Sequence, residues 1–458
     1  MLSAIFEQFV QESPVSVMMQ AGMERIFAPE KLDGLFEEKA QQQYTRELLF
    51  STVVGVMGLV VCGIRPSVSA AHKAMEKQIG VSRVALYSKL NGIETRVSQA
   101  LVRYSASELG ELIAPLNRPE SFLIQGYRVK IIDGNHLGAT EHRLSVLRQV
   151  EGGPLPGQSL VVLDPQSKLV VDVFPCEDAY TQERALLNGV LKTVVAQDLW
   201  IGDRNLCTRS FLIGIAAQRA CFVIRQHQQI PLTAQSELRC IGNSPTGKVF
   251  EQPVVIIDED ENEWHLRRVV VQLHQPTQDG DTEVAVLTNL PNTIADATVV
   301  SQLYLGRWTI EGLFQVVTDQ FACEIKTLGY PQAALFSFCM ALVAYNLLAL
   351  VRTALGSVHG HGKVEAGISN YYLVEEIQAT NRGMMIAIPS IDWQVIRSLS
   401  PEEFCSHLQY WASHVNLKRF ASSPRGKKNR TPDRPREPHR PHVSTARLLA
   451  QNQNKCSP

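Results

Sequence analysis

The run YRVKIIDG, at residues 127–134, decides the fold, because its apolar residues are typical of a strand that ends on an Asp-Gly pair. Two further runs rich in β-branched residues follow at 159–164 and 168–174, and a Pro-Gln-Ser turn separates them. The elements expected next are a helix at 179–196, a strand at 198–202, a helix at 207–218 and a strand at 220–225. The sequence therefore predicts a fold of the α/β class with mixed α+β character.

This order of three antiparallel strands, helix, strand, helix and strand resembles the RNase H-like fold. The resemblance implies carboxylates at neighbouring strand ends and on a later helix. Asp133 ends the first expected strand, and Asp203 follows the fourth in the run WIGDRN. Taken singly, an Asp at the end of a strand is typical of a turn or a helix cap. The hypothesis of a shared site therefore needs a third acidic residue.

That residue lies in the run YLGRWTIEGLFQVVT, which begins at Tyr304 and ends at Thr318. Read as a helix, the run places on one face Tyr304, Arg307, Trp308, Glu311 and Gln315. Two residues separate the Tyr from the Arg, and three separate the Arg from the Glu. This spacing resembles the signature of the insertion-sequence-four family of DDE transposases. The alternative is an amphipathic helix with a solvated polar stripe.

The resemblance implies that Asp133, Asp203 and Glu311 hold two Mg²⁺ ions, which Mn²⁺ can replace. Ions in such centres lie ~3.5–4 Å apart, and Mg²⁺ prefers carboxylate oxygens. Tyr304 and Arg307 would contact DNA near the cleaved phosphate, because a guanidinium binds two phosphate oxygens at once. The predicted chemistry is phosphodiester cleavage and strand transfer.

The chain departs from the family at Thr318, where a Lys is usual. One phosphate contact is then missing, or Lys326 supplies it. Family members excise their element by double-strand breaks, in several cases through a hairpin in which an aromatic ring holds a flipped base. Trp308 or Trp264 would hold that base, and a buried core position is the alternative for each.

Residues 1–120 have helical periodicity throughout. Residues 74–87 resemble a helix-turn-helix, with a Gly turn and a Ser-capped second helix that would bring Arg83 and Lys89 to DNA. An ordinary helical hairpin is the alternative. Residues 48–64 are uncharged, and a buried core helix is favoured there over a membrane span.

The segments after residue 120 differ in composition. We expect the first part of the catalytic core at 121–225, an inserted β-domain at 226–296, the second part of the core at 297–355, a helical region at 356–417 and a basic tail at 418–458. A glycine-rich loop is expected at 356–370. The tail shows no apolar period, so it is predicted to lack regular structure, with Lys427 and Lys428 neutralising phosphates. A solubilising tail without a partner is the alternative.

Bulk composition is compatible with this organisation. A chain of 458 residues with 45% hydrophobic and 19% charged residues is globular and large enough for several units. The formal net charge of −1 is the sum of a basic C-terminal tail and an acidic remainder of the chain, whose charges nearly cancel. Nine scattered cysteines form no zinc pattern, so we expect reduced thiols in a cytoplasmic protein. The N-terminal sequence lacks a basic start followed by an apolar run and a cleavage site, so no signal peptide is expected. The resemblance to the transposase family implies a bacterial protein associated with the nucleoid.

The expected function is that of an insertion-sequence transposase. It would bind terminal inverted repeats in double-stranded DNA, act on DNA as at least a homodimer, and need no membrane. Three alternatives remain open at this point. They are a catalytically inactive DNA-binding descendant, favoured by Thr318 alone, a nuclease without strand transfer, and a protein anchored in a membrane by residues 48–64.

Overall fold

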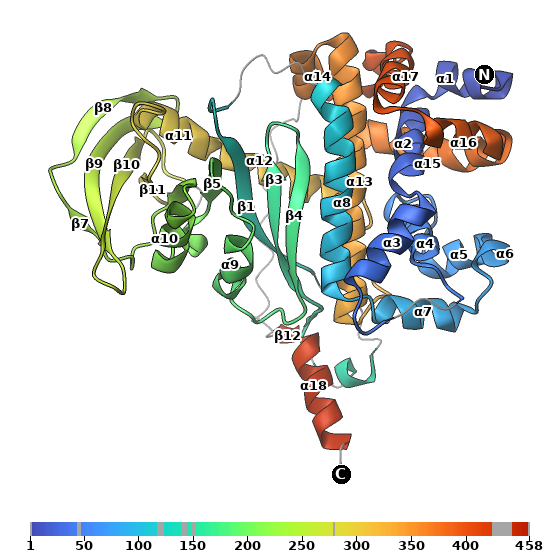
Figure 1. Ribbon diagram of the computed structural model, residues 1–458, viewed down its shortest axis with the longest axis horizontal. Coiled ribbons are helices and arrows are strands. Elements are labelled where there is room, and N and C mark those ends of the chain that lie inside the picture. The colour runs from blue at the N-terminus through green and yellow to red at the C-terminus, as the bar shows by residue number, and fades with distance from the viewer. Residues whose placement is uncertain are drawn as a thin grey trace.

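The computed structural model describes residues 2–43, 47–116, 123–138, 144–148, 150, 152–277, 280–423 and 442–456. Lys427 and Lys428 lie outside them, so their expected role stays a prediction. In Figure 1 a twisted sheet lies on one side and a helical body on the other. Helices α8 (Thr95–Leu116) and α13 (Pro331–His359) run between the two, and both contact β4.

Five strands form one half of the sheet in the order β4-β3-β1-β5-β6, with β4 at the edge. β1 pairs with β3 and β3 with β4 antiparallel, whereas β1, β5 and β6 are parallel neighbours. This topology is the RNase H-like fold, and it confirms the predicted fold class. The bounds are β1 Arg128–His136, β3 Gln158–Asp164, β4 Leu169–Cys176, β5 Asp198–Gly202 and β6 Cys221–Arg225.

Alternation along β1 explains why this sheet is covered on both faces. Ile131 packs into the core shared with the helical body, whereas Ile132 belongs to a second core. The second core includes residues of α9 (Glu183–Leu191) and α10 (Arg209–Ala217), so both helices cover that face. Successive strand residues point to opposite faces, and both sets are apolar here.

The insertion at 226–296 continues the same sheet. β11 pairs antiparallel with β6, and β10 and β9 follow, with β7 and β8 both paired to β9. The result is one ten-stranded sheet. The bounds are β7 Thr233–Ala234, β8 Arg239–Ser244, β9 Gly247–Ile257, β10 Glu263–Leu273 and β11 Glu283–Thr288.

The helical body joins both ends of the chain, and the prediction of an all-helical N-terminal region is confirmed for the described residues. The C-terminal helices α15 to α17 pack on α2, and the Phe6 ring lies 5.3 Å from Trp393 and 5.9 Å from Trp411. The bounds are α1 Ala4–Glu12, α2 Pro14–Ile26, α3 Pro29–Lys39, α4 Phe50–Val61, α5 Val68–Ala74, α6 Glu76–Ile79, α7 Arg83–Asn91, α15 Asn370–Ala387, α16 Ser390–Ser398 and α17 Pro401–Ser413.

Two apolar helices are relevant to the alternative of a protein anchored in a membrane. Most side chains of α4, the core of the uncharged stretch at 48–64, are buried in the protein. Among the described residues, α13 is the one helix long and apolar enough to cross a membrane, and 94% of its apolar window is buried inside the protein. A mostly buried helix of this kind is what the core of a globular protein requires.

The segment expected to be a helix-turn-helix differs in one detail. The helical segment before the turn is divided at Met75 into α5 and α6, and Gly80 follows in the left-handed conformation with φ of 67°. Ser82 caps α7 as expected, because its side chain accepts the Ala85 N–H. The turn therefore needs its glycine, since other residues rarely adopt a positive φ.

The C-terminal third departs from two expectations. The expected glycine-rich loop is helical instead, because α13 runs to His359 and α14 spans His361–Gly367. The tail is also not without structure, since β12 (Val443–Ser444) pairs with β2 (Pro154–Leu155) and α18 spans Thr445–Cys456. Asp178 holds this segment, accepting hydrogen bonds from Ser444 and Arg447, each of 2.7 Å. A strand of two residues has no sequence period, so long-range pairing alone orders it.

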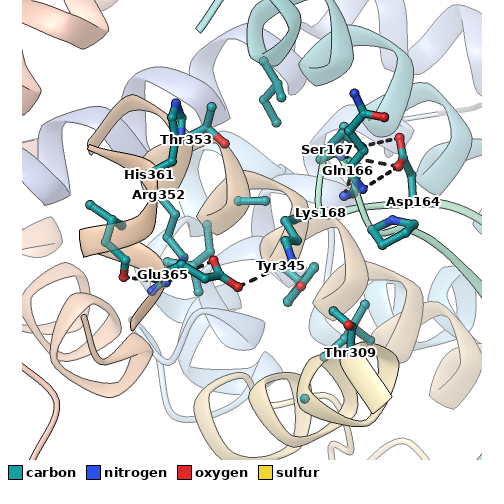
Figure 2. Close-up of a pocket in the computed structure, with 18 of the residues that line it drawn as sticks. Asp164, Gln166, Ser167, Lys168, Thr309, Tyr345, Arg352, Thr353, His361 and Glu365 are labelled. Atoms are coloured by element: carbon teal, nitrogen blue, oxygen red, sulfur yellow. Dashed lines mark hydrogen bonds and ion pairs between the residues drawn. The ribbon is translucent and has the colours of Figure 1, made fainter. Parts of the chain in front are cut away.

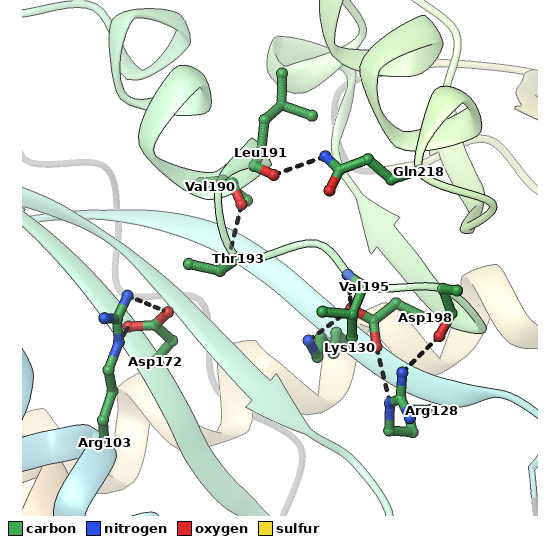
Figure 3. Close-up of polar contacts among 11 residues, drawn as sticks. Arg103, Arg128, Lys130, Asp172, Val190, Leu191, Thr193, Val195, Asp198 and Gln218 are labelled. Carbon is green, nitrogen blue, oxygen red and sulfur yellow. Dashed lines mark hydrogen bonds and ion pairs between the residues drawn. The ribbon is translucent and has the colours of Figure 1, made fainter.

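A buried carboxylate fixes the first residue of β5. Asp198 is fully buried and accepts hydrogen bonds from Lys130 Nζ at 2.8 Å, Arg128 Nε at 3.0 Å and the Val195 N–H at 3.0 Å (Figure 3). On the edge strand β4, Asp172 accepts two hydrogen bonds from Arg103 of α8. Asp203 follows the opposite end of β5.

Candidate active site

Asp133 and Asp203 lie on adjacent parallel strands. Asp133 is the sixth residue of β1, and Asp203 comes directly after β5. Because Ile132 pairs with Gly202, the next residue on each strand reaches the same edge of the sheet. The structure therefore brings these two predicted carboxylates together.

The third carboxylate comes from a helical run with a break in it. α11 (Ala297–Leu305) leads into a 3-10 turn (Gly306–Trp308) and then α12 (Thr309–Gln320), where a single helix was predicted. Glu311 lies in the first turn of α12. The tighter turn changes the directions of the side chains between Tyr304 and Glu311, so they do not share one solvated face.

Arg307 joins the two halves of the site. Its guanidinium donates to Asp133 Oδ2 at 2.7 Å and to Glu311 Oε1 at 2.9 Å. The Arg307 residue is 8% exposed, and its Nε has no hydrogen-bond partner among the described residues. One buried cation thus holds together carboxylates that are 178 positions apart in the sequence.

Asp133 has a perturbed acidity. Burial raises the pKa of Asp133 to about 6, and the negative charges of Asp203 and Glu183 act in the same direction. Arg307 and the Gly134 N–H oppose the shift, because both favour the ionised carboxylate. A carboxyl group with several acidic neighbours is a strong functional candidate.

This pKa predicts how metal binding depends on pH. Asp133 must lose its proton before its oxygens can bind a cation, so below about pH 6 the affinity for Mn²⁺ should fall by up to about tenfold per pH unit. Above that pH the proton is already lost, and the affinity should level off. Titration of the full chain with Mn²⁺ between pH 5 and 8 measures this. A plot of Mn²⁺ affinity against pH whose slope does not change between pH 5 and 7 would contradict the assignment of Asp133 as a metal ligand.

Tyr304 and Trp308 have opposite environments. Tyr304 is buried, and burial raises the pKa of its hydroxyl to about 12. Trp308 is 57% exposed, with the Arg307 guanidinium 5.1 Å from its ring centroid. The buried-core alternative is therefore wrong for Trp308. Trp264 is half-buried, and its Nε1 donates to Asp258 at 2.9 Å.

The donor set fits a hard divalent cation, although the side chains do not yet converge on one point. Among the described residues, no three His, Cys, Asp or Glu groups could hold one ion as they stand. Arg307 lies between Asp133 and Glu311, and its positive charge compensates the negative charges of these carboxylates. Carboxylate oxygens are the ligands that Mg²⁺ prefers.

Sequence reasoning did not find Glu183. This residue begins α9, and a Cβ atom added to Gly134 would lie 1.9 Å from its Oε1. Its carboxylate therefore lies against β1, one residue beyond Asp133. An acidic residue in the first turn is common in helices because it interacts favourably with the helix dipole. No other feature of the sequence distinguishes Glu183.

The remaining predicted DNA contacts are spread over the surface. Arg83 is exposed at the start of α7, whereas Lys89 lies 4.0 Å from the Phe36 ring and burial lowers the pKa of its ammonium group. The Lys89 ammonium group thus packs on the helical body, and its contact with DNA stays a prediction. Lys326 is exposed, two residues after Glu324, which accepts the Gly138 N–H at 2.7 Å near the end of β1.

A cavity of about 1180 Å³ lies on another side of α12 and is not this site. Thr309 and Leu313 line it from α12, together with the β3–β4 turn and α14. Figure 2 shows Glu365 pointing into it with Arg352 and Lys168 close by, and its oxygens lie 3.7 Å and 3.5 Å from those two cations. None of the three predicted carboxylates lines this cavity.

Acidic side chains on β1, directly after β5 and on a later helix, assembled by an RNase H-like sheet, point to one class of enzyme domain. Residues 125–347 match the family model of the transposase DDE domain. The matched segment contains Asp133, Asp203 and Glu311.

One solved structure is similar to this chain over most of its length. A piggyBac transposase in a synaptic complex with hairpin DNA is similar, with a TM-score of 0.40 and 11% identity over 86% of this chain and 84% of that chain. A search of curated proteins finds no match. The DDE domain match does not include α1 to α8 or α14 to α18.

Proposed function

We propose that this chain is an insertion-sequence transposase of the insertion-sequence-four family, which cuts DNA at the element's terminal inverted repeats and joins it to a target. The observation that carries the proposal is the buried contact of Arg307 with both Asp133 and Glu311 beside Asp203. The DDE domain match supports the enzyme class. The spacing of Tyr304, Arg307 and Glu311 supports the narrower family.

The carboxylates of Asp133, Asp203 and Glu311 would hold two Mg²⁺ ions. Bound ions activate an oxygen nucleophile and stabilise the leaving oxygen of a phosphodiester. Tyr304 keeps its proton at neutral pH because its pKa is about 12, so its hydroxyl can donate to a phosphate oxygen. Arg307, once released by the carboxylates, can bind the same phosphate through two N–H groups.

The DNA surface in this proposal includes Trp308 and Arg83. The exposed Trp308 ring lies 5.1 Å from the guanidinium of Arg307, the residue that binds Asp133 and Glu311, and the ring can stack on a base, an interaction of about 1–3 kcal/mol. Arg83 stands at the exposed N-terminus of α7, where it can meet phosphate or base edges. The DNA affinity of the Trp308→Ala variant, compared with that of the wild-type protein, measures the contribution of this stacking contact.

Because two element ends must be paired, we infer a homodimer on DNA in the cytoplasm.

The test is cleavage and joining of DNA that carries the element's own ends. Wild-type protein should cut these ends and produce joined products in Mg²⁺ or Mn²⁺, and a chelator should abolish both reactions. Cleavage without joined products would favour a nuclease. Binding without cleavage in either metal would favour an inactive DNA-binding descendant, and absence of specific binding would overturn the proposal.

A further inference from the structure

Val84 is one of the most exposed large apolar side chains among the described residues, at 76% exposure. It is the second residue of α7, directly after Arg83. We propose that α7 enters the major groove of the element's ends and that Val84 contacts the methyl group of a thymine there. This inference rests on the proposed function, and it names the helix and the side chain that read the DNA sequence.

The fold does not need a valine at this position. Leu86 and Leu90 attach α7 to the helical body, and both are fully buried. The turn before α7 is attached as well, because the His72 Nε2–H donates to the Val81 carbonyl at 2.8 Å. Val84 adds little to this packing, and a β-branched residue is a weaker helix former than alanine. The exposed valine is therefore better explained by a contact outside the chain.

The exposed face of α7 is shaped for close approach to a groove. Ser82, Ala85 and Ser88 are exposed and have small side chains, so Arg83 and Val84 are the two large exposed side chains in the first two turns. In a helix-turn-helix, the first residues of the second helix are those that contact base edges in the major groove. Apolar contact with the thymine methyl group is one of the direct readout contacts available there.

The charge around α7 favours DNA as the partner of this face. Helices α5 and α7 contain no acidic residue, and Figure 1 shows α5, α6 and α7 at the outer end of the helical body, with the sheet on the opposite side. Across residues 68–91 four cations outnumber the one acidic residue, Glu76, by three; they are Lys73, Lys77, Arg83 and Lys89. A basic surface complements the phosphates that border the groove. A protein partner would instead be expected to need a broad apolar patch.

The test uses duplex DNA that carries the element's own ends, with each thymine replaced in turn by uracil, which lacks only the methyl group. Binding of the full chain is followed by fluorescence anisotropy. One replacement should weaken binding of the wild-type protein by about fourfold, as expected for one buried methyl group. Val84→Ala should bind the thymine-containing ends about fourfold more weakly. The same replacement should then change the affinity of Val84→Ala by less than about 1.5-fold, because the two changes remove one contact.

Val195→Ala is the matched control, since it makes the same substitution at a position that is 50% exposed and lies before β5. It should respond to uracil as wild type does, and circular dichroism should show that both variants are folded. Specific binding by wild type that tolerates uracil at every position would overturn this inference alone. A thymine that stays sensitive in Val84→Ala would also overturn it. Wild-type protein without preference for the element's ends would overturn the proposed function.

Discussion

Glu311→Gln should lower the rate of Mg²⁺-dependent DNA cleavage by at least about a thousandfold, equivalent to about 4 kcal/mol of transition-state stabilisation. Glutamine keeps the size of the side chain and removes the charge that a divalent ion needs. The substitution also takes away one of the two carboxylates bound by Arg307. Single-turnover cleavage of labelled element ends at saturating protein measures the effect.

Binding of the ends should survive this substitution. The Glu311 side chain is 44% exposed, so its replacement should change the free energy of unfolding very little. Asp319→Asn is the matched control, because it removes an exposed carboxylate from the same helix. Cleavage by Glu311→Gln within about tenfold of wild type would remove this residue from the centre.

The largest effect on stability is expected at Asp198. Asp198→Ala should lower the free energy of unfolding by about 3–5 kcal/mol, because it leaves Arg128 and Lys130 without their carboxylate. The Val195 N–H loses its acceptor at the same time. Urea unfolding followed by circular dichroism measures the change in this free energy.

Asp260→Ala is the control for Asp198→Ala. Asp260 is exposed, and its side chain makes no described contact. The control should unfold within about 0.5 kcal/mol of wild type. A loss below about 1 kcal/mol in Asp198→Ala would show that this cluster does not hold β5 in place.

Much of the fold could be predicted because strands and helices have different apolar periods. The runs that became β1, β3, β4, β5 and β6 each alternate or remain continuously apolar, and their order alone identified the sheet. The nearness of Asp133 and Asp203 also followed, since residues at the ends of adjacent parallel strands meet at one edge. These inferences need only local patterns and topology.

Features that depend on long-range contacts could not be predicted. The pairing of β11 with β6 has no signal in either strand, because a ladder is formed between backbones. β12 is ordered by partners almost 290 positions earlier, a separation no local pattern can reveal. Glu183 was hidden for a different reason, since helices carry acids in their first turn for stability alone.

The continuity of the ten-stranded sheet has a mechanical consequence. β6 and β11 are joined by backbone pairing at Ile224 and Leu287, and the Asn289 side chain bonds to the backbone of residues 220 and 222. A linker would let the added strands swing freely, whereas a hydrogen-bonded ladder resists bending. A load applied by DNA at β9 or β10 would therefore be transmitted as torque along the sheet toward β5. The insertion is therefore a stiff extension of the sheet, and β6 is the one strand between it and β5.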